Sequence, residues 1–128
     1  MKVIIFEYTP EWTTSFEEEK VSVNDCLKSL SPVTEHIGST AIHGLMAKPI
    51  LDIMVGVSQD ADLDKTIGPL KDSGYNYIEK FTDDWPARRF FQKNIKGNPK
   101  VHAIHIHVFV KDSPDWVRHL AFREYLIS

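Results

Sequence analysis

The pattern of apolar and polar positions predicts a chain that begins by alternating helices with strands. Between residues 11 and 30, apolar side chains recur at near-helical spacing, which predicts an amphipathic helix. Thr9 is its expected N-cap and Pro10 its expected first helical residue. A short strand is expected over residues 33–37 and a longer one over 49–57.

The rest of the chain is predicted to hold one helix, three strands and a final helix. The helix is expected over 61–73 and ends at Gly74, although Gly68-Pro69 should break or kink it. The strands are expected over residues 75–80, 88–95 and 101–110, and Ser113-Pro114-Asp115 opens the last helix. This order predicts an α/β or α+β mixed sheet with helices packed mainly on one face.

Composition narrows the class of protein further. The 128 residues fit a single domain, and a net charge of -3 gives no general basic footprint, so nucleic acid is not an expected partner. With Cys26 as the single cysteine, no disulfide can form within the chain, which fits a reducing compartment. The apolar run near the start is too short for a signal peptide, and no segment has the length of a membrane span. We therefore expect a cytoplasmic protein with no membrane partner.

Asp52 is the first residue that points to chemistry. It lies in a run that is apolar on both faces, as in a buried central strand. A carboxylate is costly to bury unless it is paired, hydrogen-bonded or metal-bound. The structural alternative is a carboxylate that accepts bonds from backbone amides or from a histidine. The burial and the nearby Gly-Ser turn favour a functional role.

The turn Gly38-Ser39-Thr40 follows a predicted strand and precedes the run that contains Asp52. Backbone amides at such a turn, with the Ser39 hydroxyl, can bind phosphate. Taken alone, an ordinary strand-to-helix turn with Ser39 or Thr40 as N-cap is the simpler interpretation. Lys48 shares a strand face with Asp52 but lies about 13 Å away along the strand, so each needs another main partner.

A histidine-rich strand is the second functional signal. Alternation along 101–110 places His105 and His107 on one face, while the opposite face is mostly apolar. Two histidines on one strand face can converge on a metal, an anion or a carboxylate. We therefore predict that Asp52, His105, His107 and Ser39 meet in one pocket.

The pair Arg88 and Arg89 offers a possible clamp for negative charge. Consecutive strand residues point to opposite faces, so only one of the two can face a given site. The neighbouring lysines fit a solvated hairpin. We expect one of the two arginines to be a phosphate ligand.

Several motifs together make the chain similar to the GrpB family, within the polymerase-beta-like nucleotidyltransferase superfamily. The resemblance covers essentially the whole chain, in order and with matching spacing. It is carried by Tyr8-Thr9-Pro10-Glu11-Trp12, His36-Ile37-Gly38-Ser39-Thr40-Ala41-Ile42, Gly44-Leu45-Met46-Ala47-Lys48-Pro49-Ile50-Leu51-Asp52-Ile53, Gly74-Tyr75, Arg89-Phe90-Phe91, His105-Ile106-His107-Val108 and Leu120-Ala121-Phe122-Arg123-Glu124-Tyr125-Leu126.

This resemblance implies a nucleotidyltransferase-like fold with Gly38-Ser39 as its Gly-Ser signature. Asp52 would be the first member of the superfamily's Asp-x-Asp/Glu pair and would hold Mg²⁺ or Mn²⁺. Met54 stands at the second position and cannot ligate either ion. His105 and His107 stand where a third acid is expected, although magnesium prefers oxygen ligands.

The implied partner is a nucleotide or a phosphorylated small molecule, and the implied reaction is weak nucleotidyl transfer. Asp52 would bind metal or activate a hydroxyl, with His105 and His107 orienting it or completing the pocket. The phosphate-binding residues would be Gly38, Ser39, Thr40, Lys48 and either Arg88 or Arg89. Two alternatives remain open: a non-catalytic binding domain that keeps the fold, and a zinc-type hydrolase built on Asp52, His105 and His107.

The resemblance also bears on the end of the chain. Relatives carry a further helical region, which is absent from residues 1–128. We expect the helix opening at Ser113 to leave apolar surface exposed, so that the protein forms a homodimer through it.

Overall fold

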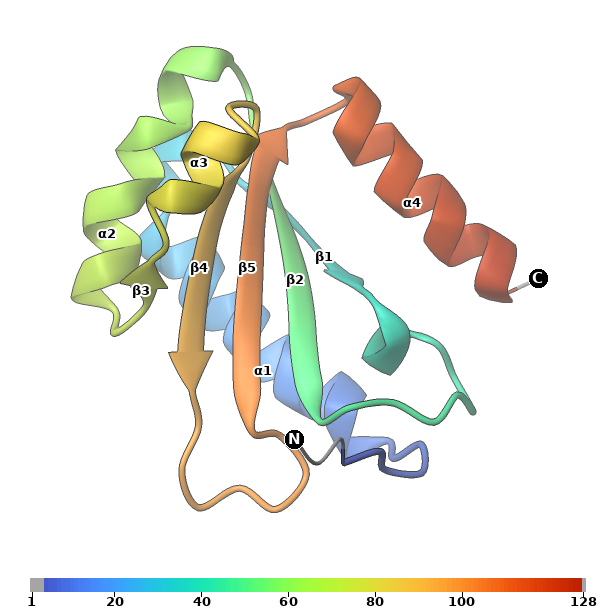
Figure 1. Ribbon diagram of the computed structural model, residues 1–128. Coiled ribbons are helices and arrows are strands. Elements are labelled where there is room, and N and C mark those ends of the chain that lie inside the picture. Colours follow the sequence, from blue (N-terminus) through green and yellow to red (C-terminus); the bar gives the residue numbers. More distant parts are fainter. Residues whose placement is uncertain (1–3, 128) are drawn as a thin grey trace.

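The computed structural model describes residues 4–127 as a five-stranded mixed sheet flanked by helices (Figure 1). Its strands are β1 (Val33–Ile37), β2 (Ile50–Val57), β3 (Asn76–Tyr77), β4 (Arg89–Asn94) and β5 (Ala103–Val110). Their order across the sheet is β1-β2-β5-β4-β3. β2 and β5 are parallel and central, and the other neighbouring pairs are antiparallel. The fold is therefore α+β, one of the two classes that the sequence predicts.

Residues 4–127 form four α-helices that pack around this sheet. They are α1 (Glu11–Cys26), α2 (Ile67–Asp72), α3 (Lys80–Asp84) and α4 (Pro114–Ile127). In Figure 1, α1 crosses behind the sheet, whereas α4 leaves the top of β5 and descends beside β1. None of the helices within residues 4–127 is long and apolar enough to cross a bilayer.

The main core lies between α1 and the sheet. Alternate residues of the central strands, such as Ile53 and Ile106, point to this face and are fully buried. The amphipathic face of α1 meets them with Trp12 and Phe16. The Trp12 indole Nε1–H also donates to the Lys100 carbonyl at 2.8 Å, so its polar atom is satisfied in the core.

The opposite face of the sheet holds a much smaller apolar cluster. Ile37, Met54, Phe109 and Trp116 form it where α4 begins. Gly56 permits this contact, because a Cβ at that position would lie 2.8 Å from the Trp116 ring. The apolar core therefore lies mainly on the α1 side, and the α4 side of the sheet is left with polar residues.

Two predicted helices are shorter than expected. The first ends at Cys26 rather than at residue 30 and is followed by a 3₁₀ turn over Lys28–Leu30. The helix expected over 61–73 is instead two 3₁₀ turns followed by Ile67–Asp72. Gly68-Pro69 lies in the first turn of that helix, where the missing proline N–H has no intrahelical partner to lose.

Further corrections concern the third strand and the first N-cap. Strand pairing covers Asn76–Tyr77 rather than 75–80, and the unexpected α3 follows. Its Phe81 ring packs 5.2 Å from the Phe90 ring, which buries apolar surface that a strand would leave exposed. Pro10 occupies the N-cap position itself, while the Glu11 amide donates to Thr9 Oγ1 at 3.2 Å.

Candidate functional site

Asp52 lies on the sheet face that carries α4. It is opposite Ile37 of the edge strand β1 and beside His105 of β5. Its side chain is 29% exposed, so the carboxylate is half-buried rather than enclosed. The strand around it is apolar on the other face, which holds this side chain in a fixed direction.

The Gly38-Ser39 turn lies directly against the Asp52 carboxylate. Gly38 has a φ of 74° and a ψ of -175°, a conformation that residues with a Cβ rarely adopt. A Cβ on Gly38 would lie 2.7 Å from Asp52 Oδ2. Glycine is therefore required at this position both for the positive φ and for the close approach of the turn to the carboxylate.

Thr40 is buried, and its hydroxyl serves the fold. Thr40 Oγ1 donates to the Ile50 carbonyl at 3.0 Å, so it accepts a bond from His36 Nε2–H at 2.9 Å. His36 stacks on Phe16 at 4.6 Å. Burial lowers the pKa of His36 to about 4, partly opposed by Asp52 and reinforced by Arg123. The hydroxyl of Thr40, predicted to bind phosphate, is thus engaged in tying β1 to β2.

Both predicted histidines contact Asp52. His107 Nε2 lies 3.2 Å and His105 Nδ1 lies 3.6 Å from Asp52 Oδ1. Arg88 Nη1 lies 3.4 Å from the other nitrogen of His107, Nδ1. A guanidinium can only donate, so Nδ1 accepts and the His107 ring proton is on Nε2, facing Asp52. Arg88, His107 and Asp52 therefore form a directed hydrogen-bond chain.

His105 is the less strongly bound of the two histidines. Burial lowers its pKa, the Asp52 carboxylate opposes that shift, and His107 adds to it. The Phe90 ring lies edge-on to both imidazoles, at 5.3 Å from His105 and 5.1 Å from His107. Phe90 thus contributes apolar surface beside both rings.

Arg88 is held by aromatic rings rather than by a carboxylate. Its guanidinium lies 4.5 Å from the centre of the Trp85 ring, with Phe81 and Phe90 beside it. Burial lowers the pKa of Arg88, and Asp115 opposes the shift. Within residues 4–127 the buried Nε finds no hydrogen-bond partner. An unsatisfied buried donor costs stability.

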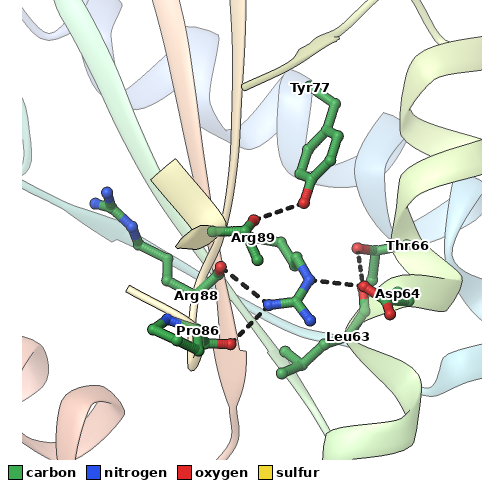
Figure 2. Close-up of polar contacts among 8 residues, drawn as sticks. Leu63, Asp64, Thr66, Tyr77, Pro86, Arg88 and Arg89 are labelled. Atoms are coloured by element: carbon green, nitrogen blue, oxygen red, sulfur yellow. Dashed lines mark hydrogen bonds and ion pairs between the residues drawn. The ribbon is translucent and has the colours of Figure 1, made fainter. Parts of the chain in front are cut away.

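Arg89 does not face this site, so only one of the two arginines does, as alternation along the strand predicts. Its Nε–H donates to Asp64 at 2.8 Å and its Nη1–H donates to the Pro86 carbonyl at 2.7 Å. Figure 2 shows Arg88 and Arg89 extending to opposite sides of β4. Strand alternation is the reason: one arginine can face His107, and its neighbour must face away.

Two cavities flank Asp52 and Ser39. The first, which we call the α4 cavity, has a volume of about 360 Å³ and lies between α4, β1 and β2. The second, the Lys48 cavity, has a volume of about 380 Å³. Asp52 and Ser39 line both cavities and His107 lines the first, whereas His105 lines neither, so three of the four residues predicted to share one pocket do so. Lys48 is exposed and lines the second cavity with Asp52 and Ser39.

His119 is a site residue that the sequence did not reveal. It lies on α4, with Asp52 and His107 lining the same cavity. Its signal in the sequence is weak, because a lone histidine on an amphipathic helix is ordinary and its proximity to Asp52 depends on how α4 docks.

Metal binding at Asp52 must rely on few protein ligands. Over residues 4–127, no cluster of three or more histidine, cysteine or acidic side chains is arranged to hold a metal ion. Met54, at the second position of the predicted carboxylate pair, is 0% exposed and packs in the small apolar cluster. Of the predicted carboxylate pair only Asp52 offers oxygen ligands, so the donor set does not fit a two-ion centre.

Comparison with solved structures first defines the class of fold. An RNA terminal U-transferase aligns with a TM-score of 0.59 at 12% identity, covering 93% of this chain and 36% of that one. The Cid1 poly(U) polymerase aligns with a TM-score of 0.55 at 12% identity, covering 93% and 36%. At such low identity the likeness shows the fold alone, which is nucleotidyltransferase-like.

The family follows from closer matches. The family model described as "GrpB protein" matches residues 2–128, and this chain belongs to the GrpB family. GrpB from Enterococcus faecalis has a TM-score of 0.81 at 36% identity, with 97% of this chain and 72% of that one covered. The "Glutamate-rich protein GrpB" of Alkalihalophilus pseudofirmus is 31% identical, over 98% of this chain and 71% of that protein.

Other curated relatives are longer. "UPF0157 protein YqkA" of Bacillus subtilis is 34% identical over 98% of this chain, which spans 35% of that protein. "UPF0157 protein BH1888" of Halalkalibacterium halodurans is 34% identical over 97% of this chain, which spans 60% of that protein. This chain therefore covers only part of these relatives, and an activity of the whole proteins can be assigned to it only as a proposal.

Proposed function

We propose that this protein binds a nucleotide or another phosphorylated small molecule at Asp52, with the help of Mg²⁺ or Mn²⁺, and transfers nucleotidyl groups slowly or not at all. One observation carries the proposal: the Gly38 backbone brings the Gly-Ser turn against Asp52 Oδ2, between two cavities. A turn and a carboxylate so close together suit a phosphate that a cation bridges to the protein.

The charges around Asp52 favour a phosphate in the Lys48 cavity. Lys48 supplies an exposed ammonium to one cavity, and Ser39 supplies a hydroxyl to both. Arg88 does not point to this turn; its Nη1–H donates to His107 instead. Lys48 is therefore the cation that we assign to the phosphate, and Arg88 keeps the predicted task of steadying charge only indirectly, through His107 and Asp52.

A single cation is what we propose, since within residues 4–127 Asp52 is the one acidic residue lining the two cavities and Met54 offers no carboxylate. When bound, such an ion would neutralise phosphate charge. Two-ion centres in active nucleotidyltransferases stabilise both the attacking and the leaving oxygen. A site with half of those ligands loses an electrostatic contribution of several kcal/mol, which corresponds to roughly a thousandfold in rate.

In nucleotidyl transfer at this site, the Asp52 carboxylate would be the base. An acceptor hydroxyl oxygen forms a bond to the α-phosphorus, the bond between that phosphorus and the bridging oxygen breaks, and pyrophosphate leaves. The hydroxyl proton passes to the Asp52 carboxylate. The His107 Nε2–H bond to Asp52 Oδ1 at 3.2 Å holds the carboxylate in place and leaves Oδ2 to accept the proton.

A non-catalytic binding domain is the second candidate function. The observation that favours it is the complete burial of Met54 among Ile37, Phe109 and Trp116. A carboxylate at that position would have to lie in an apolar cluster, so the packing itself excludes a second metal ligand. Both candidates predict ligand binding, and turnover separates them.

Thermal-shift titration with nucleoside triphosphates, with and without Mg²⁺ or Mn²⁺, tests the proposal. We expect a cation-dependent rise in Tm for the wild type and its loss in Asp52→Asn. Asp72→Asn, at an exposed position of α2, is the matched control and should keep the wild-type shift. Equal shifts in wild type and Asp52→Asn would remove Asp52 from the site. Rapid release of pyrophosphate would show that the protein is an efficient enzyme, and no release would favour the binding domain.

A further inference from the structure

His119 lines the α4 cavity and carries a hydrogen-bond acceptor on its ring. On the first turns of α4, its Nδ1 lies 2.8 Å from the Asp115 carbonyl oxygen. A carbonyl can only accept, so Nδ1 carries the ring proton and Nε2 carries the lone pair. The ring is held by Phe109 at 5.2 Å and by Trp85 at 6.4 Å, which fixes its direction.

The other polar groups of the α4 cavity do not supply a free positive charge. Asp52 brings a carboxylate, and Arg123 is already engaged by Glu35 at 3.1 Å and Glu124 at 3.0 Å. Its Nη1–H also donates to the His36 carbonyl at 3.0 Å. Ser39 brings a hydroxyl, and His107 also lines the cavity but its Nε2–H is already donated to Asp52. A phosphate in this cavity would therefore meet two acceptors, one hydroxyl and a neutralised guanidinium. An uncharged group with hydroxyl donors meets complementary partners there.

The walls of the same cavity suit a flat ring. Ile37 and Ile42 line it from β1 and the turn, and Phe122 and Leu126 line it from α4. Apolar walls with a few convergent polar groups are typical of small-molecule sites. The Lys48 cavity, on the other side of Asp52 and Ser39, carries the exposed ammonium that a phosphate requires.

Taking the proposed function as given, we propose that the α4 cavity binds the nucleoside half of the ligand, with His119 Nε2 accepting a hydrogen bond from a sugar hydroxyl, and that the phosphates lie in the Lys48 cavity. The ligand then spans Asp52, which faces its sugar–phosphate junction. His119 is a ligand-binding residue in this assignment, and the orientation of the ligand follows from the charge of the two cavities.

Binding of separated ligand fragments tests this assignment. The probes are adenosine, guanosine, cytidine and uridine, the 2′,3′-dideoxy form of the tightest binder, and inorganic pyrophosphate with Mn²⁺, each titrated by NMR. We expect His119→Asn to weaken the nucleoside about tenfold, as for one lost hydrogen bond, and to leave the dideoxy form and pyrophosphate unchanged. Lys48→Met should weaken pyrophosphate and leave the nucleoside unchanged.

The choice of variants separates binding from folding. An asparagine side chain can reproduce the Nδ1–H bond to the Asp115 carbonyl but has no atom at the position of Nε2, whereas His119→Gln does the reverse and should recover part of the nucleoside affinity. His102→Asn, at an exposed histidine before β5, is the control and should change nothing.

The outcomes are distinct for the two proposals. Pyrophosphate binding without any nucleoside binding overturns the present inference and leaves the proposed function standing. Nucleoside binding that His119→Asn does not weaken, or weakens equally for the dideoxy form, also overturns the inference. Binding of neither kind of probe overturns the proposed function itself.

Discussion

The two faces of the sheet differ sharply, and Phe90 and Phe91 show it within one strand. Phe91 points to α1, is 0% exposed and belongs to the main core. Phe90 points the other way, and its ring lies against His105, His107 and the Arg88 guanidinium. One phenylalanine fills a core, and its neighbour forms the floor of a polar site.

The difference shows how this fold separates stability from chemistry. Side chains from α1 and α2 fill the first face, so a polar group there needs an internal partner, as His36 has in Thr40. On the second face α4 packs mainly through Trp116, and the half-buried Asp52 and its histidines keep contact with solvent. A ligand can reach charged groups on that face without opening the core.

The largest expected effect comes from emptying the core face. Phe91→Ala should lower the free energy of unfolding by about 3–5 kcal/mol, because it leaves a cavity among fully buried residues. Phe90→Ala is the matched variant: we expect a smaller loss, together with shifted NMR signals of His105 and His107. Chemical denaturation measures both. An equal or larger loss at Phe90 would contradict the division between the faces.

The next effect is the pH dependence that buried His36 imposes. Its pKa is lowered from 6.5 to about 4 in the folded protein. Between these values the unfolded chain binds more protons, so stability falls as the pH drops from about 6.5 to about 4. The loss amounts to roughly 3 kcal/mol at and below the folded pKa, since one pKa unit corresponds to about 1.4 kcal/mol.

Unfolding free energies measured across this pH range test the sign and the size. His36→Gln cannot titrate, so its stability should depend less on pH than that of the wild type. His102→Gln, at an exposed position, is the control and should retain the wild-type slope. A wild type whose stability is constant from pH 6.5 to pH 4 would show that His36 takes up its proton without cost.

Glycine at position 38 should matter through both strain and contact. Gly38→Ala places a non-glycine residue in a conformation with φ of 74° and a Cβ 2.7 Å from Asp52 Oδ2. We expect a loss of about 1–3 kcal/mol in unfolding free energy and a weakened ligand-induced thermal shift. Gly97→Ala shares the positive φ but meets nothing within 4 Å, so it should cost stability without changing ligand binding. If Gly38→Ala and Gly97→Ala changed ligand binding equally, Gly38 would not be part of the binding site.

Alternation explains how much of this could be predicted from the sequence. A period of two assigns His105 and His107 to the face opposite the core, and the isolated polarity of Asp52 requires a partner that they provide. The close approach of Gly38 to that carboxylate follows from the antiparallel pairing of β1 with β2, which places Ile37 opposite Asp52.

Other features depend on tertiary packing and leave little local signal. Alternation leaves open whether Arg88 or Arg89 faces the site, and the choice follows from where β4 lies in the sheet. α3 forms because Phe81 can bury itself on Phe90, a contact that becomes available only once the sheet exists. His119 reaches the site because Trp116 docks beside Gly56 and so directs α4 along β1.

The smallest effect on stability is expected at the apolar surface of α4. Phe122 is 62% and Leu126 is 41% exposed, which agrees with the apolar surface that the sequence predicts for this helix. We expect the wild type to form a homodimer through this surface at high concentration, as sedimentation velocity can measure. Leu126→Glu should keep the protein monomeric while changing the unfolding free energy of the monomer by no more than about 0.5 kcal/mol. Val21→Glu, on the exposed side of α1, is the control and should still dimerise. A wild type that stays monomeric at every concentration would assign the exposed residues of α4 to the ligand cavity alone.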